Sequence, residues 1–122
     1  PFFLGHADER GEGAGLGANL NLPLPRGTGF DQWHDTLLTA LEAVRQFGTQ
    51  ALVVPLGVDT FADDPISGFG LQSTDYLTVG QTLASLGLPT VFTFEGGYAV
   101  AEVGTNTTNV LEEFAARHNH GR

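Results

Sequence analysis

The amino-acid sequence predicts an α/β fold in which a parallel sheet carries helices on both faces. Two observations support this class. Short apolar runs at 51–56 and 90–94 have the composition of strands that are buried between helical layers. Helical periodicity precedes, separates and follows these runs, at 30–47, 73–86 and 100–117. Strands and helices that alternate along a chain form parallel sheets with crossover helices, so a single α/β domain is expected.

The N-terminal part predicts an irregular segment followed by a first strand. Residues 1–17 are rich in glycine and show neither a helical nor a strand period. Residues 19–24 alternate polar and apolar side chains, which predicts a strand. Pro23 and Pro25 end this strand or place it at an edge of the sheet, because proline cannot donate a hydrogen bond to the ladder.

The first helix is expected at 30–47, where apolar side chains recur every three to four residues and form one face. These side chains are Trp33, Leu37, Leu38, Leu41, Val44 and Phe47. Asp31 is placed to cap the amino end of this helix. Gly48 is placed to take the left-handed conformation that commonly follows the carboxyl end of a helix.

The second strand and the second helix follow. The run 51–56 is apolar throughout, although Pro55 is unusual in a central strand. A loop over 57–72 then leads to a helix that Ser73 is placed to cap, and Asp75 lies near the positive end of that helix.

A third strand and a last helix complete the predicted order. Residues 90–94 are β-branched and aromatic, and Glu95–Tyr98 forms a sharp turn after them. The last helix begins near Val100 and ends near Arg117, and Gly104 weakens its first half. A sheet of three strands has two open edges, which tend to pair with other chains.

Composition narrows the classes of function. The net charge of −9 comes from 14 acidic residues against five arginines, with no lysine. This balance argues against nucleic-acid binding and favours the attraction of cationic ligands to an acidic surface. No apolar run is long enough to cross a membrane, and no signal peptide is recognised, so a cytoplasmic protein is expected. Without cysteine, neither disulfides nor thiolate metal sites can form.

Two reactive side chains follow the two apolar strands. Asp59 comes after the second strand and Tyr98 after the third. The carboxyl ends of parallel strands meet at one edge, where open α/β sheets bind ligands. Gly96 and Gly97 let the backbone approach a ligand closely. A carboxylate and a phenol at one pocket are half of a metal-assisted hydrolase site. The alternatives are an aspartate that caps its own loop and a tyrosine that serves packing.

Four segments, in order, resemble motifs of the zinc-dependent deacetylases, which include the histone deacetylases and the acetylpolyamine amidohydrolases. They are Pro1–Gly5, Asn21–Pro25, Gly57–Thr60 with Asp64, Pro65 and Phe69, and Glu95–Tyr98. The residues of these segments resemble the bacterial acetylpolyamine amidohydrolase-like branch more than the eukaryotic histone deacetylases. The resemblance implies that residues 1–122 are one partial domain, the C-terminal part of an arginase/deacetylase-like three-layer αβα fold.

The resemblance also implies roles for single residues. Asp59 corresponds to one of three protein ligands of the catalytic zinc, and Tyr98 to the tyrosine that polarises the scissile amide carbonyl. The substrate would be an acetylated amine or polyamine. The residues implied to line the substrate channel are Phe3, Pro65, Ile66, Gly96 and Gly97.

The family's paired histidines and its Asp-x-His zinc ligands are absent from the sequence. A catalytic zinc site needs three protein ligands, so we expect this chain to be inactive without an N-terminal half. The alternative is a non-catalytic α/β protein that forms a homo-oligomer through exposed apolar surfaces. The sequence leaves both readings open.

Overall fold

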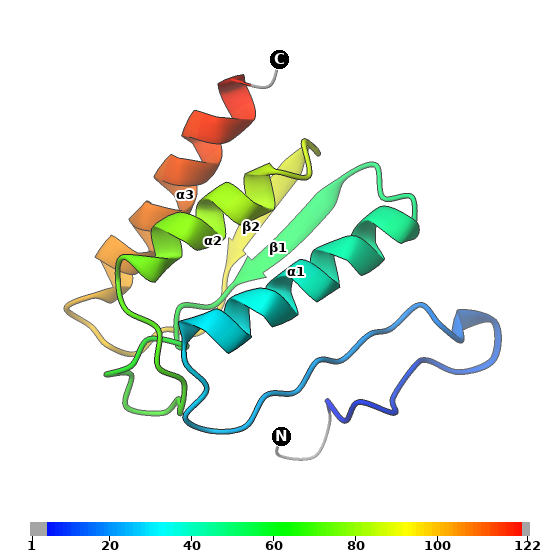
Figure 1. Ribbon diagram of the computed structural model, residues 1–122, viewed down its shortest axis with the longest axis horizontal. Helices are drawn as coiled ribbons and strands as arrows, with labels where there is room; N and C mark the ends of the chain where they lie inside the picture. Colours follow the sequence, from blue (N-terminus) through cyan, green and yellow to red (C-terminus); the bar gives the residue numbers. More distant parts are fainter. Residues whose placement is uncertain (1–4, 121–122) are drawn as a thin grey trace.

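The computed structural model describes residues 5–120, and side chains up to residue 118. The elements in chain order are a 3₁₀ turn η1 (Gly13–Gly15), α1 (Phe30–Gln46), β1 (Leu52–Leu56), α2 (Asp75–Ala84), β2 (Thr90–Phe94) and α3 (Val103–His120). The two strands pair in parallel, with Leu52 opposite Thr90 and Leu56 opposite Phe94. Helix α2 connects them, so the α/β class and the parallel sheet are confirmed (Figure 1).

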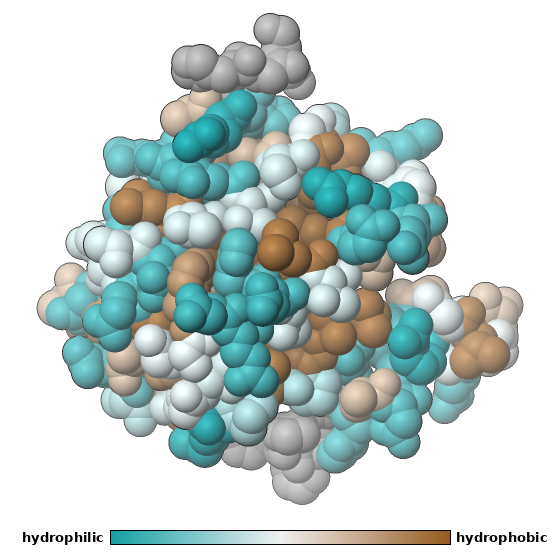
Figure 2. All heavy atoms as spheres, in the orientation of Figure 1, coloured by the Kyte–Doolittle hydropathy of each residue, from teal (hydrophilic) through white to brown (hydrophobic). Residues whose placement is uncertain are grey.

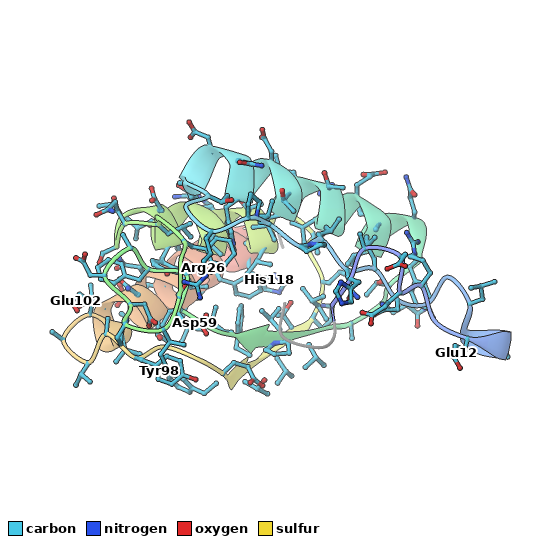
Figure 3. The ribbon with its side chains drawn as sticks, turned by 90° about the horizontal axis from the view of Figure 1, so that it is seen from below. Glu12, Arg26, Asp59, Tyr98, Glu102 and His118 are labelled. Atoms are coloured by element: carbon cyan, nitrogen blue, oxygen red, sulfur yellow. The ribbon has the colours of Figure 1, made fainter. Side chains whose placement is uncertain are left out.

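The three helices lie on one face of the two-stranded sheet (Figures 1 and 3). Along β1 the side chains alternate, so that Leu56 is buried while Val53 is 65% exposed. Val91 on β2 is likewise 60% exposed. Because β1 is apolar on both faces, its sequence predicts two covering layers. Residues 5–120 supply one of them, and the expected helices on the second face are not formed by this part of the chain.

The strand expected at 19–24 is absent from the described residues, and this prediction is wrong. Its polar side chains bond to the preceding loop instead of alternating across a sheet. The Asn19 Nδ2 donates to the Glu9 backbone oxygen at 2.6 Å, and the Asn21 Nδ2 donates to Glu9 Oε2 at 2.9 Å. This segment is therefore irregular and bonds to the loop before it, and the sheet of residues 5–120 has two strands rather than three.

The predicted helix caps need correction. Helix α1 begins after Gly29, and Asp31 lies in its first turn without a capping bond. Helix α2 begins after Thr74, and Ser73 does not cap it. Here the Asp75 Oδ2 accepts a hydrogen bond from the Gln72 N–H at 2.7 Å, which fixes the chain entering the helix.

The predicted helix ends hold better. Gly48 has a φ of +76°, as expected for the residue that follows the C-cap Phe47 of α1. Helix α3 begins at Val103, three residues later than predicted, and Gly104 does not interrupt it.

The core lies between the helices and the covered face of the sheet. Helices α2 and α3 pack closely at Gly80, where an added Cβ would overlap the carbonyl oxygen of Val110. The buried apolar cluster consists of Leu41, Leu56, Val58, Phe61, Leu71, Tyr76, Val79, Leu83 and Val110. On the face turned to the viewer, polar side chains interrupt the apolar ones (Figure 2). No described helix is long and apolar enough to cross a membrane.

Candidate active site

The β1–β2 ladder continues past the ends of both strands. The Glu95 N–H donates to the Leu56 carbonyl at 3.0 Å, and the Val58 N–H donates to the Gly96 carbonyl at 2.7 Å. These two bonds hold the loop after β1 beside the turn after β2. Asp59 and Tyr98 therefore lie at the same end of the sheet (Figure 3), as the sequence predicts for the carboxyl edge of parallel strands.

Two glycines make this close approach possible. A Cβ on Gly96 would overlap the Asp59 Oδ2, so only glycine leaves room for the carboxylate. Gly97 has a φ of +154°, and a Cβ there would lie 2.7 Å from Val58 Cγ2. The glycine pair thus lets the turn pack directly against the Asp59 loop, immediately before Tyr98.

The Asp59 carboxylate is half-buried at this junction. Burial raises its pKa, the neighbouring Asp64 charge raises it further, and a hydrogen bond from the Asp59 backbone partly offsets both effects. A carboxylate whose charge is disfavoured gains from a nearby cation. The Tyr98 side chain is 48% exposed, so its ring is accessible from solvent.

Asp64 joins the two loops. Its side chain is 6% exposed, and its two oxygens serve different segments. The Oδ1 accepts from the N–H groups of Ile66 and Ser67 at 2.9 and 3.1 Å, and the Oδ2 accepts from the Tyr98 N–H at 2.8 Å. Burial alone would raise the pKa of the Asp64 carboxyl, but backbone N–H donors outweigh it and lower that pKa below its ordinary value. These donors belong to Ile66, Tyr98, Ser67 and Ala99.

Tyr76 supports the Asp59 loop from below. Its hydroxyl donates to the Val58 carbonyl at 3.1 Å and lies 2.9 Å from Thr60 Oγ1, so it contacts the residues on both sides of Asp59. Burial raises the pKa of Tyr76 to about 12, and the charges of nearby aspartates, including Asp59, also raise it. The hydroxyl therefore keeps its proton at neutral pH.

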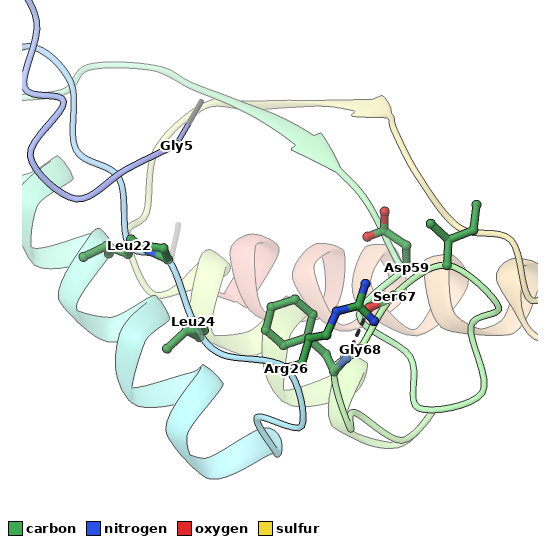
Figure 4. A pocket seen from close by; sticks show the side chains of 10 residues that line it. Gly5, Leu22, Leu24, Arg26, Asp59, Ser67 and Gly68 are labelled. Carbon is green, nitrogen blue, oxygen red and sulfur yellow. Dashed lines mark hydrogen bonds between the residues drawn. The ribbon is translucent and has the colours of Figure 1, made fainter. Parts of the chain in front are cut away.

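An open cleft of about 450 Å³ lies beside Asp59. The cleft is lined by Gly5, Leu22, Pro23, Leu24, Arg26, Asp59, Ile66, Ser67, Gly68 and Phe69. The Arg26 side chain packs over Gly68, where an added Cβ would lie 2.8 Å from Arg26 Cγ. Figure 4 shows the N-terminal arm and the loop after β1 forming opposite walls of this cleft, with Asp59 at its edge.

Of the residues that the resemblance implies for the substrate channel, some line this cleft and others lie outside it. Ile66 lines the cleft, whereas Pro65 is exposed outside it. Gly96 and Gly97 lie behind Asp59 rather than along the cleft. Phe3 lies outside the described residues.

The described residues do not fit a zinc ion by themselves. Asp59 offers one carboxylate, and no group of three histidine, cysteine, aspartate or glutamate side chains converges within this part of the chain. A catalytic zinc site uses three protein ligands and one open position. The arrangement can therefore supply one ligand and a phenol to a site, but not a complete metal centre.

Sequence reasoning missed the structural roles of Asp64, Tyr76 and Arg26. Asp64 precedes Pro65, and that pair indicates a local turn, which the bonds to Ile66 and Ser67 indeed form. Its bond to Tyr98 spans 34 residues, so no local pattern could indicate it. Tyr76 matches the apolar spacing of α2, and its hydroxyl partners become visible only in three dimensions.

Comparison with known proteins places the chain. The profile of the histone deacetylase domain matches residues 1–114. Acetylpolyamine amidohydrolase 1 of Pseudomonas aeruginosa is 55% identical over 119 residues, which are 96% of this chain and 34% of the relative. Acetylpolyamine amidohydrolase of Mycoplana ramosa is 50% identical over 115 residues, again 34% of the relative. The chain spans about a third of the length of these curated relatives.

Solved structures agree with the sequence matches. The crystal structure of acetylpolyamine aminohydrolase from Burkholderia pseudomallei superposes with a TM-score of 0.91 at 36% identity, over 94% of this chain and 34% of that one. The HDA15 HD domain superposes with a TM-score of 0.84 at 25% identity, over 93% of this chain and 33% of that one. The sheet edge, its two loops and the match over residues 1–114 together establish that this chain belongs to the histone deacetylase family.

Proposed function

We propose that this chain forms part of the active site of a zinc-dependent amidohydrolase that removes acetyl groups from acetylated amines or polyamines. The observation that carries the proposal is the pair of backbone hydrogen bonds past the strand ends, from Glu95 to Leu56 and from Val58 to Gly96, which brings Asp59 and Tyr98 to one edge of the sheet. Relatives named acetylpolyamine amidohydrolases, up to 55% identical, support the same chemistry.

Within that site we assign Asp59 as one zinc ligand. The pKa of its carboxyl is raised, chiefly by burial, so a bound cation would relieve an unfavourable charge. The zinc would supply the activation of water for attack on the amide. The remaining ligands and the general base must come from outside the described residues.

We assign Tyr98 as the donor that polarises the acetamide carbonyl. A phenol placed where negative charge develops stabilises the tetrahedral intermediate more than the substrate, and that difference accelerates the reaction. The half-exposed ring can reach a substrate, while its backbone N–H is anchored by Asp64. The excess of acidic residues favours a cationic substrate such as a polyamine.

A chimera tests these roles. The segment of this chain that matches the 55%-identical Pseudomonas aeruginosa relative would replace the corresponding segment of that relative. We expect the chimera to bind zinc and to hydrolyse N-acetylputrescine. Asp59→Ala should lose both zinc and activity, whereas Tyr98→Phe should keep zinc and lose on the order of 10²-fold in kcat.

Asp63→Ala is the matched control, because Asp63 is an exposed aspartate of the same loop. It should leave zinc content and kcat unchanged. Full activity in the Tyr98→Phe chimera would contradict the role of the tyrosine. Retained zinc in the Asp59→Ala chimera would contradict the role of the carboxylate.

A second candidate function is non-catalytic self-association. It is favoured by apolar side chains that stand exposed on the open face of the sheet and around the turn after β2, where Phe94 is 77% and Val100 87% exposed. Size-exclusion chromatography with light scattering at two concentrations tests it. A stable oligomer without zinc would favour this candidate, and a monomer at both concentrations would exclude it.

A further inference from the structure

We propose that Asp64 is a positioning residue. It holds the turn after β2, which carries Tyr98, in a fixed position against the loop after β1, which carries Asp59. The inference rests on the proposed function for the roles of Tyr98 and Asp59, and it assigns to a third side chain the task of setting their relative position. Asp64 itself does not line the cleft. It acts through the backbone of Tyr98.

The geometry makes Asp64 a bridge between segments far apart in sequence. One carboxylate oxygen accepts from Ile66 and Ser67, within the loop that carries Asp64, and so fixes the orientation of the carboxylate. The other oxygen then accepts from the Tyr98 N–H at 2.8 Å, across 34 residues. Because the bonds to Ile66 and Ser67 fix the Asp64 carboxylate, its second oxygen can restrain the position of the Tyr98 N–H.

The charge matters as well as the shape. Asp64 is 6% exposed, and a buried carboxylate is stable only when donors surround it. Hydrogen bonds from N–H groups to an ionised oxygen are roughly twice as strong as neutral ones. An asparagine has the same shape but a single acceptor oxygen. It could therefore satisfy the Ile66 and Ser67 donors or the Tyr98 donor, but not both sets.

The turn before Tyr98 has little stiffness of its own. Gly96 and Gly97 lack side chains and can adopt backbone angles closed to other residues. Gly97 already sits at a φ of +154°. The bond from the Tyr98 N–H to Asp64 is therefore a main restraint on where the ring of Tyr98 stands. Once this acceptor is lost, the ring should sample several positions.

The chain offers a direct probe, because it contains two tyrosines, Tyr98 and the buried Tyr76. Labelling with 3-fluorotyrosine gives one fluorine resonance for each, and Tyr76→Phe assigns them. In Asp64→Asn we expect the Tyr98 resonance to broaden while the Tyr76 resonance stays sharp. The Asp64 charge also acts on the Tyr76 hydroxyl, so line width, and not position, distinguishes the two. Exchange of the Tyr98 amide hydrogen should accelerate at least tenfold. Asp63→Asn, the same change at an exposed neighbour, should alter neither.

Unchanged Tyr98 fluorine and amide signals in Asp64→Asn would overturn the proposal. Equal broadening of both tyrosine resonances would also overturn it, because a purely structural role loosens the core around Tyr76 as well. If Asp64→Asn does not fold, hydrogen exchange in the unmodified chain decides the question. Protection of the Tyr98 amide supports the bond, and exchange at the rate of an exposed amide refutes it.

These measurements use neither zinc nor substrate, so they separate this inference from the proposed function. In the chimera, Asp64→Asn adds a functional readout. A positioning role predicts a lower kcat with unchanged KM and zinc content. Failure of the chimera to bind zinc would contradict the proposed function and leave the fluorine result standing.

Discussion

Single side chains beneath the loops determine the geometry of the candidate site. Asp59 lines the cleft, whereas the Tyr76 hydroxyl bonds to the Val58 carbonyl and the Thr60 hydroxyl on either side of it, and Asp64 ties its loop to Tyr98. Tyr76 and Asp64 act through hydrogen bonds to groups that are separated from them in sequence. At this scale the stability of the fold and the shape of the site depend on the same bonds.

Tyr76→Phe should destabilise the chain by about 1–3 kcal/mol, because the Val58 carbonyl and the Thr60 hydroxyl lose a buried partner. Urea unfolding followed by the fluorescence of Trp33, the single tryptophan, measures this loss. Tyr98→Phe is the matched control, since its hydroxyl belongs to a half-exposed ring. It should change stability by no more than about 0.5 kcal/mol. Equal losses in the two variants would contradict the role of Tyr76.

Asp64 should also give the chain a characteristic pH dependence. Its folded-state pKa is lowered, so its contribution to stability is complete above the ordinary aspartate value of about 3.9. That contribution is lost as the pH falls below this value and through the lowered pKa. Asp64→Asn should be less stable than the parent chain at pH 7, and the difference should shrink toward pH 3. Urea midpoints across this range test it, and a difference that grows on acidification would refute it.

At the scale of elements, composition and periodicity predicted most of the fold. Both strands and all three helices lie close to their expected places. Each has an apolar pattern of its own period in the sequence, and that pattern matches the face that it buries. The expected strand at 19–24 has the right alternation. Asn19 and Asn21 nevertheless bond to Glu9, and a tertiary arrangement of this kind overrides the pattern.

The candidate site was predictable only in part for the same reason. Asp59 and Tyr98 follow strands, so the topology of parallel sheets brings them to one edge. The bond from Tyr98 to Asp64 depends on the exact packing of two loops, which no periodicity encodes. Sequence reasoning therefore predicted that Asp59 and Tyr98 meet at one edge of the sheet and missed the side chains that position them.

Packing between elements is tightest at the crossing of α2 and α3. Gly80→Ala should destabilise the chain by about 1–3 kcal/mol, because the new methyl group overlaps the Val110 carbonyl oxygen and forces the helices apart. Gly104→Ala makes the same change in α3, where the new Cβ has no neighbour within 4 Å beyond the adjacent residues and the backbone of its own helix. It should stabilise by roughly 0.5–1 kcal/mol through helix propensity. Thermal melts of both variants test the pair, and shifts of the same sign would contradict the close contact.

At the scale of the whole molecule, one face of the sheet is covered and the other is open. Val53 and Val91 are more than half exposed on that open face. The chain spans about a third of the length of the structures that it superposes on. We therefore expect this open face to contact another protein chain or a second copy of this chain.

The double variant Val53→Thr and Val91→Thr should reduce self-association without loss of secondary structure. Threonine keeps the β-branch that strands prefer and removes apolar surface. Sedimentation velocity should report a smaller average mass than for the parent chain at the same concentration. Thr93→Val, which adds apolar surface on the exposed side of β2, should have the opposite effect. An unchanged mass in both variants would show that this face takes no part in association.

The long span of the Tyr98–Asp64 bond has a consequence for the time course of folding. The two groups are 34 residues apart, and the whole of α2 and β2 must be in place before they meet. Contacts between distant parts of a chain form late, because the intervening loop must first be closed. During synthesis on a ribosome, the loop after β1 would leave the exit tunnel before β2 and Tyr98 do. Its Asp64 carboxylate would therefore lack the Tyr98 partner until β2 has folded. Assembly of the site should therefore be among the last events in folding, and partly folded chains should not present it.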